Sequence, residues 1–316
     1  MAPTYYDLAC DKDFWIKLNP DLHIEGVAAK NAWSPLNLQK NVLEDFKKDM
    51  VQDGYFVSEP VLDPAEMAKL TDAVKVLALE QWPTIFAMVY DEFWQVYQRA
   101  GSVLNHILGS NYRQLPNFWV YHIAPDHGGS GWAPHRDRAQ TVTIRPDGMP
   151  NSMTIWIALN DATLWNGCMY VLPARRDLNY PHSPWNFELG VKDLQSIRAL
   201  PAKTGSILSW NESLIHWGAK SSDKAQGPRV SAACAFQRAD IDPLETPILD
   251  PYIVPSFKTR LGIIGQQLFR FAIHTGMPEA VRNLAQELGK LSETIQIYDQ
   301  SNPYKGAKAG KIKVAR

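Results

Sequence analysis

Six short runs of β-forming residues, separated by turn-forming residues, constrain the fold of this chain more than any other feature. The runs cover residues 118–123, 153–159, 168–172, 206–210, 214–218 and 229–237. The pair Asn166-Gly167 is a tight-turn signal, and it predicts a hairpin whose second strand is the run 168–172. Short strands with turn signals between them favour an antiparallel sandwich or barrel over an alternating α/β sheet.

Apolar residues at helical spacing flank this β region on both sides. They predict helices at about 37–52, 63–82 and 84–110 before it, and at about 261–272 and 280–297 after it. Asp63-Pro64 supports the start of the second helix, because Asp63 can cap it and proline fits its first position. We expect the first 40 residues to form an irregular arm on the surface and residues 305–316 to form a frayed end.

The organisation of the chain predicts one domain, because no internal repeat or linker divides residues 1–316. Its parts would be an N-terminal arm with helices (1–115), a β core that carries the site (116–240) and a C-terminal helical extension (241–316). A chain of 316 residues is long enough to bury a large core.

The composition excludes several classes of protein. A formal net charge of −1 predicts no broad attraction to nucleic acid or to anionic membranes. Cys10, Cys168 and Cys234 lie far apart, so neither a zinc knuckle nor a disulfide framework is indicated. No apolar run approaches the ~18 residues that a membrane span needs, and the first residues lack the pattern of a signal peptide. We therefore expect a cytoplasmic protein with reduced thiols.

The chemistry centres on the stretch Trp132-Ala133-Pro134-His135-Arg136-Asp137-Arg138. In an extended segment, residues two apart point to the same side, so His135 and Asp137 can direct a nitrogen and a carboxylate oxygen at one point. Together with a second histidine they would form the two-histidine, one-carboxylate face of non-haem Fe(II) oxygenases. Taken alone, the triplet can also arise by chance in a chain with 8 histidines.

Two residues downstream complete the constellation. His216 lies 81 residues after His135, within the run 214–218, and Arg229 lies 13 residues further on at the start of the last run. Alone, His216 could be a half-buried histidine satisfied by a hydrogen bond, and Arg229 a solvated residue at a strand end. A guanidinium at that position could also hold a carboxylate bidentately. The order and spacing of these residues favour a metal site over the separate explanations.

These residues resemble the Fe(II)/2-oxoglutarate dioxygenases and, within them, the phytanoyl-CoA dioxygenase (PhyH-like) family. Other stretches of similar pattern lie within residues 40–240, and they are residues 46–57, Trp156-Ile157-Ala158-Leu159-Asn160-Asp161-Ala162, Asn166-Gly167-Cys168-Met169 and Gly205-Ser206-Ile207-Leu208-Ser209-Trp210. The chain departs from the family pattern at residues 174–176 and at Gly218. The departures concern the substrate contacts more than the metal site.

The resemblance implies a mainly β fold with flanking helices (α+β), in which a double-stranded β-helix (a cupin-like jelly roll) has N- and C-terminal helices packed outside. It implies that His135, Asp137 and His216 hold Fe(II), and that Arg229 clamps the far carboxylate of 2-oxoglutarate. With O2 as the other co-substrate, oxidative decarboxylation would give succinate and CO2 while a substrate C–H bond is oxidised.

Further residues are candidates for lining the pocket. Thr154 and Trp156 alternate onto one face of a strand and would line the co-substrate site if that face is inward, although core packing also explains Trp156. The weaker substrate candidates are Tyr121, His122, Tyr180 and Trp185; of the first two, alternation allows only one to face inward. Tyr180 and Trp185 belong to the long loop 173–196, which is either a lid or a loop packed permanently on the surface.

Three functions from different classes remain open. The first is an oxygenase that hydroxylates, or otherwise oxidises, an unactivated C–H bond of a small organic molecule in specialised metabolism. The second is a non-haem iron halogenase, which Asp137 opposes because that class has a small residue in place of the carboxylate ligand. The third is a non-enzymatic jelly-roll protein that binds a small molecule. We expect no nucleic-acid or membrane partner, and the sequence leaves assembly as a homodimer open.

Overall fold

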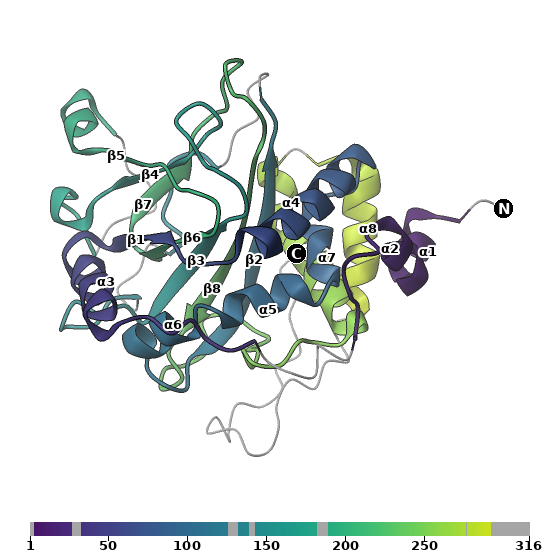
Figure 1. The fold of residues 1–316 in the computed structure, drawn as a ribbon, viewed down its shortest axis with the longest axis horizontal. Coiled ribbons are helices and arrows are strands. Elements are labelled where there is room, and N and C mark those ends of the chain that lie inside the picture. The colour runs from purple at the N-terminus through teal and green to yellow at the C-terminus, as the bar shows by residue number, and fades with distance from the viewer. Residues whose placement is uncertain are drawn as a thin grey trace.

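The strands form two antiparallel sheets (Figure 1). This computed structural model describes residues 3–26, 33–125, 132–138, 143–181, 189–275 and 277–291. Within these residues, the larger sheet has the order β1-β6-β3-β8-β2, and the smaller has the order β5-β4-β7. The larger sheet consists of β1 (Tyr55–Pro60), β2 (Arg113–Ile123), β3 (Ser152–Ala158), β6 (Ser206–Asn211) and β8 (Arg229–Gln237), and the smaller of β4 (Met169–Leu172), β5 (Arg198–Leu200) and β7 (Ile215–Gly218).

Two of the three inner strands of the larger sheet, β3 and β8, are buried along their whole length. Both of their faces are covered, so their sequences show continuous apolar and small residues instead of a polar and apolar alternation. In their antiparallel register Thr154 pairs with Ala235, and Trp156 pairs with Ala233. Large side chains of β3 therefore lie beside small ones of β8, which leaves space above β8 on the face that these residues share.

The smaller sheet is extended by the segment that carries the predicted metal ligands. His135 forms an isolated antiparallel bridge with His216 of β7, so residues 132–138 continue this sheet beyond β7. From this segment, the side chain of Asp137 reaches Thr154 of β3 and Trp210 of β6 in the larger sheet.

The predicted hairpin at Asn166-Gly167 is wrong. The strand before the turn, β3, pairs with β6 and β8, whereas β4 pairs with β5 and β7, so the chain crosses from one sheet to the other at this point. The side chain of Asn166 stabilises the crossing turn: its amide oxygen accepts a hydrogen bond from the Thr163 N–H (2.6 Å), and its amide nitrogen donates to the Asp161 carbonyl (2.8 Å).

The helices between residue 40 and β2 are α3 (Lys40–Asp53), α4 (Pro64–Leu79), the 3₁₀ helix η2 (Thr84–Val89), α5 (Glu92–Gln98) and α6 (Gly101–Leu108). The first two confirm the predicted helices, and Asp63 caps α4 through a hydrogen bond from the Ala65 N–H (2.8 Å). The single helix predicted at 84–110 is instead three short ones. Tyr90 adopts an extended conformation that ends η2, and the next residue, Asp91, accepts hydrogen bonds from the N–H groups of Glu25 and Gly26.

The prediction of an irregular surface arm at residues 1–40 is wrong for residues 5–18. They contain α1 (Tyr5–Cys10) and α2 (Lys12–Leu18), and Trp15 of α2 is completely buried. Its indole donates to the Ala9 carbonyl (2.9 Å) and stacks on Phe86 at 5.3 Å between ring centres. Helices of this length carry too few apolar positions for their period to stand out in the sequence.

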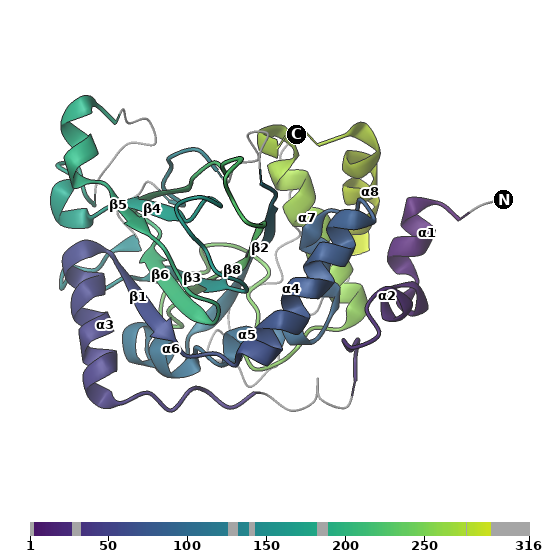
Figure 2. The ribbon, with the colours of Figure 1, turned by 45° about the horizontal axis from the view of Figure 1, so that its top comes forward.

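The C-terminal helices α7 (Phe257–Thr275) and α8 (Glu279–Gly289) pack together, and α7 also packs against β2 and η2. Figures 1 and 2 show α4 and α7 on the β2 side of the larger sheet, with α3 beside β1 at the opposite edge. The short 3₁₀ helices η4 (Ala174–Arg176) and η5 (Val191–Ser196) lie between β4 and β5. No helix in the described parts of the chain is long and apolar enough to cross a membrane.

The turn before β6 gives a test of the fold. Gly205 has a φ of +83°, and a Cβ atom there would lie 2.6 Å from the Leu62 carbonyl oxygen. We expect Gly205→Ala to lower the free energy of unfolding by about 1–3 kcal/mol, because both the conformation and the close approach oppose a side chain. Gly227→Ala is the matched control, since a Cβ atom added to Gly227 would have no other atom within 4 Å. Urea denaturation measures both, and equal stabilities of the two variants would contradict this close packing.

Candidate metal centre

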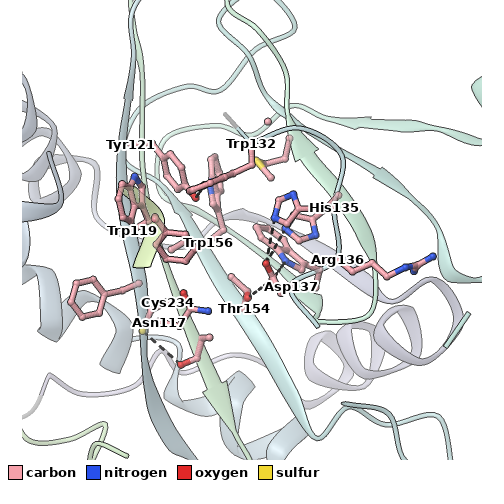
Figure 3. Close-up of a pocket in the computed structure, with 18 of the residues that line it drawn as sticks. Asn117, Trp119, Tyr121, Trp132, His135, Arg136, Asp137, Thr154, Trp156 and Cys234 are labelled. Atoms are coloured by element: carbon pink, nitrogen blue, oxygen red, sulfur yellow. Dashed lines mark hydrogen bonds and ion pairs between the residues drawn. The ribbon is translucent and has the colours of Figure 1, made fainter. Parts of the chain in front are cut away.

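His135, Asp137 and His216 are brought together by backbone pairing. The His135 N–H donates to the His216 carbonyl (3.0 Å), and the His216 N–H donates to the His135 carbonyl (2.9 Å). Directly paired residues of antiparallel strands project their side chains to the same face, so the two imidazoles lie side by side with 4.4 Å between ring centres. Asp137, two residues after His135, points to that same face (Figure 3).

The three side chains form a group that could hold one metal ion. Nε2 of His135 and Nε2 of His216 lie 3.5 Å and 3.6 Å from Oδ1 of Asp137, and one potential ligand atom from each residue lies within 4.8 Å of the others. This is the only such group of His, Cys, Asp and Glu found among the described residues. Two imidazoles and one carboxylate are the ligand set of a facial triad.

Each histidine is oriented by the same local hydrogen bond. Nδ1 of His135 lies 2.7 Å from the Ala133 carbonyl oxygen, and Nδ1 of His216 lies 3.0 Å from the Leu214 carbonyl oxygen. A carbonyl can only accept, so each Nδ1 carries the proton and each Nε2 keeps its lone pair. Those lone pairs are directed toward Asp137, as a metal ligand requires.

The carboxylate of Asp137 is held from the larger sheet. Its Oδ2 accepts hydrogen bonds from Nε1 of Trp210 on β6 (3.0 Å) and from Oγ1 of Thr154 on β3 (3.2 Å), which leaves Oδ1, the oxygen nearer the two histidines, available to a metal. Burial alone would raise the pKa of Asp137, but His216, His135 and the Trp210 indole hold that pKa well below its usual range. The group is therefore ionised at neutral pH, in the state that binds a cation.

The two histidines differ in their electrostatic surroundings. Burial lowers the pKa of His216 to about 4, although Asp137 opposes the shift. Burial also acts to lower the pKa of His135, but the hydrogen bond and charge of Asp137 outweigh it and raise that pKa. His216 is thus neutral and ready to ligate across the physiological pH range, whereas His135 is the ligand for which protons compete with a metal.

Arg136, between the two ligands, points away from them (Figure 3). Its Nη1 donates to the Ser213 carbonyl (2.5 Å), and its Nη2 forms an ion pair with Asp177 (2.7 Å). Both side chains of this pair are buried. The alternation of the strand thus separates the motif into two ligands on one face and an anchor on the other.

The triad opens into a cavity of about 470 Å³ that also contains Arg229. The Arg229 guanidinium is buried between two aromatic rings, with its Cζ 5.5 Å from the centre of Tyr121 and 5.7 Å from that of Trp156. Its polar neighbours are the Ser231 hydroxyl (3.3 Å) and the Met169 sulfur (3.8 Å). Burial lowers its pKa to about 10, so it stays cationic at neutral pH.

Two buried polar atoms in this part of the cavity lack a partner among the described residues. They are Nε of Arg229 and Nε1 of Trp156. No carboxylate among the described residues forms an ion pair with Arg229 either. A buried cation without a counter-ion is costly, so the site has the properties of a receptor for an anionic ligand.

The other predicted pocket residues have different positions. Tyr121 lines the cavity, and its hydroxyl accepts a hydrogen bond from Nε1 of Trp132 (2.9 Å), while the adjacent His122 is not among the lining residues. Tyr180 does not line the cavity, because its hydroxyl is bound by the amide of Asn211 (2.9 Å). Trp185 lies outside the described residues, as does the central part of the predicted lid at 182–188.

Several lining residues were not predicted from the sequence. One is Trp210, which pairs with the predicted pocket residue Thr154 in the sheet and lies on the same face. Another is Trp119, which strand alternation could have identified, because it lies two residues before Tyr121 on β2. Arg270 and Phe271 of α7 also line the cavity, but nothing in the C-terminal sequence relates them to the metal ligands.

Comparison with known proteins relates the fold and the site to the Fe(II)/2-oxoglutarate-dependent oxygenases. Residues 83–227 match the family model described as Phytanoyl-CoA dioxygenase (PhyH), and this stretch includes His135, Asp137 and His216. The match confirms, over residues 83–227, the resemblance seen in the sequence. The chain matches no curated protein.

Solved structures of similar fold include a non-haem, α-ketoglutarate-dependent enzyme. The non-haem α-ketoglutarate-dependent epimerase SnoN from nogalamycin biosynthesis is 18% identical, with 64% of this chain and 82% of that chain covered and a TM-score of 0.50. EctD from S. alaskensis in its apo form is 16% identical, with 69% and 88% covered and a TM-score of 0.48. At this identity the similarity to SnoN supports the fold, which is the predicted jelly roll with flanking helices.

The hydrogen bond from Trp210 to Asp137 gives a test of the metal centre. We expect Trp210→Phe to weaken Fe(II) binding about tenfold, because a partner that orients a ligand carboxylate is lost while the ring is kept. Trp217→Phe is the control, since Trp217 stacks on Tyr170 (5.7 Å) and does not line the cavity. Anaerobic calorimetric titration with Fe(II) measures both affinities. Equal affinities in the two variants would show that Asp137 does not depend on this indole.

Proposed function

We propose that this protein uses Fe(II), 2-oxoglutarate and O2 to oxidise an unactivated C–H bond of a small organic molecule in specialised metabolism, with release of succinate and CO2. The observation that carries the proposal is the presence of two complementary receptors in one cavity. One is the His135-Asp137-His216 group, which suits a divalent metal, and the other is the buried Arg229, which lacks a counter-ion among the described residues.

The metal would be held by Nε2 of both histidines and by Oδ1 of Asp137. Three protein ligands on one side leave the other positions of an octahedral ion open to the cavity. When bound, Fe(II) supplies the activation of O2 that drives decarboxylation of 2-oxoglutarate and oxidation of the substrate. The protein holds the carboxylate ionised and the imidazoles in the correct tautomer before the metal arrives.

Arg229 would bind the far carboxylate of 2-oxoglutarate. Its partnerless Nε can donate to one carboxylate oxygen while a terminal nitrogen donates to the other, in the parallel geometry that arginine and carboxylate share. The rings of Tyr121 and Trp156 exclude water on both sides of the guanidinium, which strengthens this pair. Nε1 of Trp156, also without a partner among the described residues, is a second donor for the same ligand.

The halogenase alternative finds no support in the site. That chemistry requires the carboxylate ligand to be absent, so that a halide can take its place. Here Asp137 is present, ionised and bound by two donors from the larger sheet. The remaining alternative is a protein that binds a small molecule without enzymatic activity. The succinate assay described below distinguishes it from an oxygenase.

Arg229 provides the test of the function. We expect Arg229→Ala to raise the dissociation constant of 2-oxoglutarate at least about tenfold, because a charge-assisted bidentate contact is lost, while Fe(II) affinity stays close to wild type. Arg238→Ala is the matched control, since Arg238 pairs with Asp240 at 2.6 Å and lies outside the cavity lining. Titration of 2-oxoglutarate into the anaerobic Fe(II) protein gives the constants.

Succinate release on addition of O2 then tests activity. The wild-type protein should form succinate only with both Fe(II) and 2-oxoglutarate present, and Arg229→Ala should require a higher concentration of 2-oxoglutarate. An unchanged constant in Arg229→Ala would refute the role of this arginine. Binding of both ligands by the wild type without any succinate would favour the non-enzymatic protein.

A further inference from the structure

Three aromatic side chains from distant parts of the chain meet at the metal centre. Trp119 comes from β2, Trp132 from the segment that carries the ligands and Phe271 from α7. Their ring centres are 6.1 Å (Trp119 to Trp132), 5.5 Å (Trp119 to Phe271) and 5.1 Å (Trp132 to Phe271) apart. The Trp132 ring also lies 6.3 Å from that of His135, so the cluster borders the ligand group directly.

Small side chains lie next to the cluster of Trp119, Trp132 and Phe271, which we call the aromatic wall. Trp119 pairs with Ala233 of β8, and the next inward residue of that strand is Ala235, which pairs with Thr154 of β3. All four residues line the cavity. The two alanines leave a space between larger neighbours. Trp119 borders this space on one side, and Thr154, which donates a hydrogen bond to Asp137, borders it on the other. The space is therefore adjacent both to the aromatic wall and to the metal ligands.

The charged groups at this part of the cavity already have partners. Arg270 of α7 lines the cavity, and its guanidinium forms an ion pair with Glu245. Glu245 also pairs with Arg138, which in turn pairs with the buried Glu212 at 2.8 Å. This chain of ion pairs connects α7 to the segment of the metal ligands. It fixes the helix beside the site and leaves Arg270 and Arg138 engaged with carboxylates of the protein.

We propose that Trp119, Trp132 and Phe271, with Ala233 and Ala235, form the substrate subsite, and that it takes a flat, uncharged aromatic ring system. The proposal rests on the proposed oxygenase function and adds the chemical class of the substrate. It assigns a specificity role to α7, which lies outside the residues 83–227 that match the family model. A ring held against Trp132 would lie beside His135 and hence close to the reacting centre.

The wall favours an aromatic ligand over an aliphatic or an anionic one. Aromatic rings interact through offset stacking and edge-to-face contacts, which a saturated ring of the same size makes less well. An acyl-CoA would bring several phosphate charges, and these need cations that are not already paired. Among the described lining residues, Arg270 and Arg136 are ion-paired, and Arg229 lies between Tyr121 and Trp156 at the proposed co-substrate position.

The test compares 2-naphthol with its saturated analogue, decahydro-2-naphthol, which has the same carbon skeleton without the aromatic faces. Both are titrated calorimetrically into the anaerobic protein loaded with Fe(II) and 2-oxoglutarate. We expect the wild type to bind 2-naphthol more tightly than the saturated analogue, and to bind octanoyl-CoA more weakly than 2-naphthol. Phe271→Leu should weaken 2-naphthol binding about fivefold, because an apolar side chain is kept while the aromatic face is lost. The difference in affinity between 2-naphthol and decahydro-2-naphthol should therefore be smaller in this variant than in the wild type.

Phe269→Ala is the control, because Phe269 is on the same helix but exposed and outside the cavity lining. It should bind 2-naphthol like the wild type. Equal affinity of the wild type for 2-naphthol and its saturated analogue, absence of binding, or an unchanged affinity in Phe271→Leu would overturn the subsite. The 2-oxoglutarate titration in the same samples separates the two proposals. If the wild type does not bind 2-oxoglutarate, the proposed function is wrong. If it does bind 2-oxoglutarate, the 2-naphthol result tests the substrate subsite alone.

Discussion

The backbone pairing between His135 and His216 is the interaction on which the rest of the site depends. Two hydrogen bonds, of 3.0 Å and 2.9 Å, join residues 81 positions apart in the sequence and set both imidazoles on one face. Because Asp137 follows two residues after His135, the same pairing also positions the carboxylate. The metal centre is therefore a consequence of strand geometry, and Trp210 and Thr154 only orient a group that the pairing has already placed.

The cavity combines features that would each be unfavourable without a ligand. Arg229 is a buried cation with no carboxylate partner among the described residues, and Trp156 buries an indole N–H that has no acceptor there. Such groups reduce stability unless a ligand satisfies them, which is why functional sites are where they persist. An anion bound to Arg229 and a cation bound to Asp137 would complement the two charges of the protein within one cavity. We therefore propose that a metal and an anionic co-substrate bind side by side in this cavity.

Local signals in the sequence are sufficient to predict that His135, Asp137 and His216 come together, as they do in the structure. Strand alternation relates His135 to Asp137, and the run 214–218 places His216 on a strand. The sequence does not show which strands pair, so Asn166-Gly167 predicts a hairpin although it connects the two sheets. The contribution of Phe271 is also invisible in the sequence, because it depends on how α7 packs against β2, and no local pattern encodes contacts between such distant segments.

The central claim is that His135, Asp137 and His216 hold an iron to which 2-oxoglutarate also binds. Visible absorption spectroscopy under anaerobic conditions tests it most directly, because chelation of Fe(II) by the keto acid produces a weak charge-transfer band. Our account predicts this band in the wild-type protein with Fe(II) and 2-oxoglutarate together, with neither alone, and not in His216→Ala. Absence of the band from wild-type protein that has bound both, or its full retention in His216→Ala, would contradict the account.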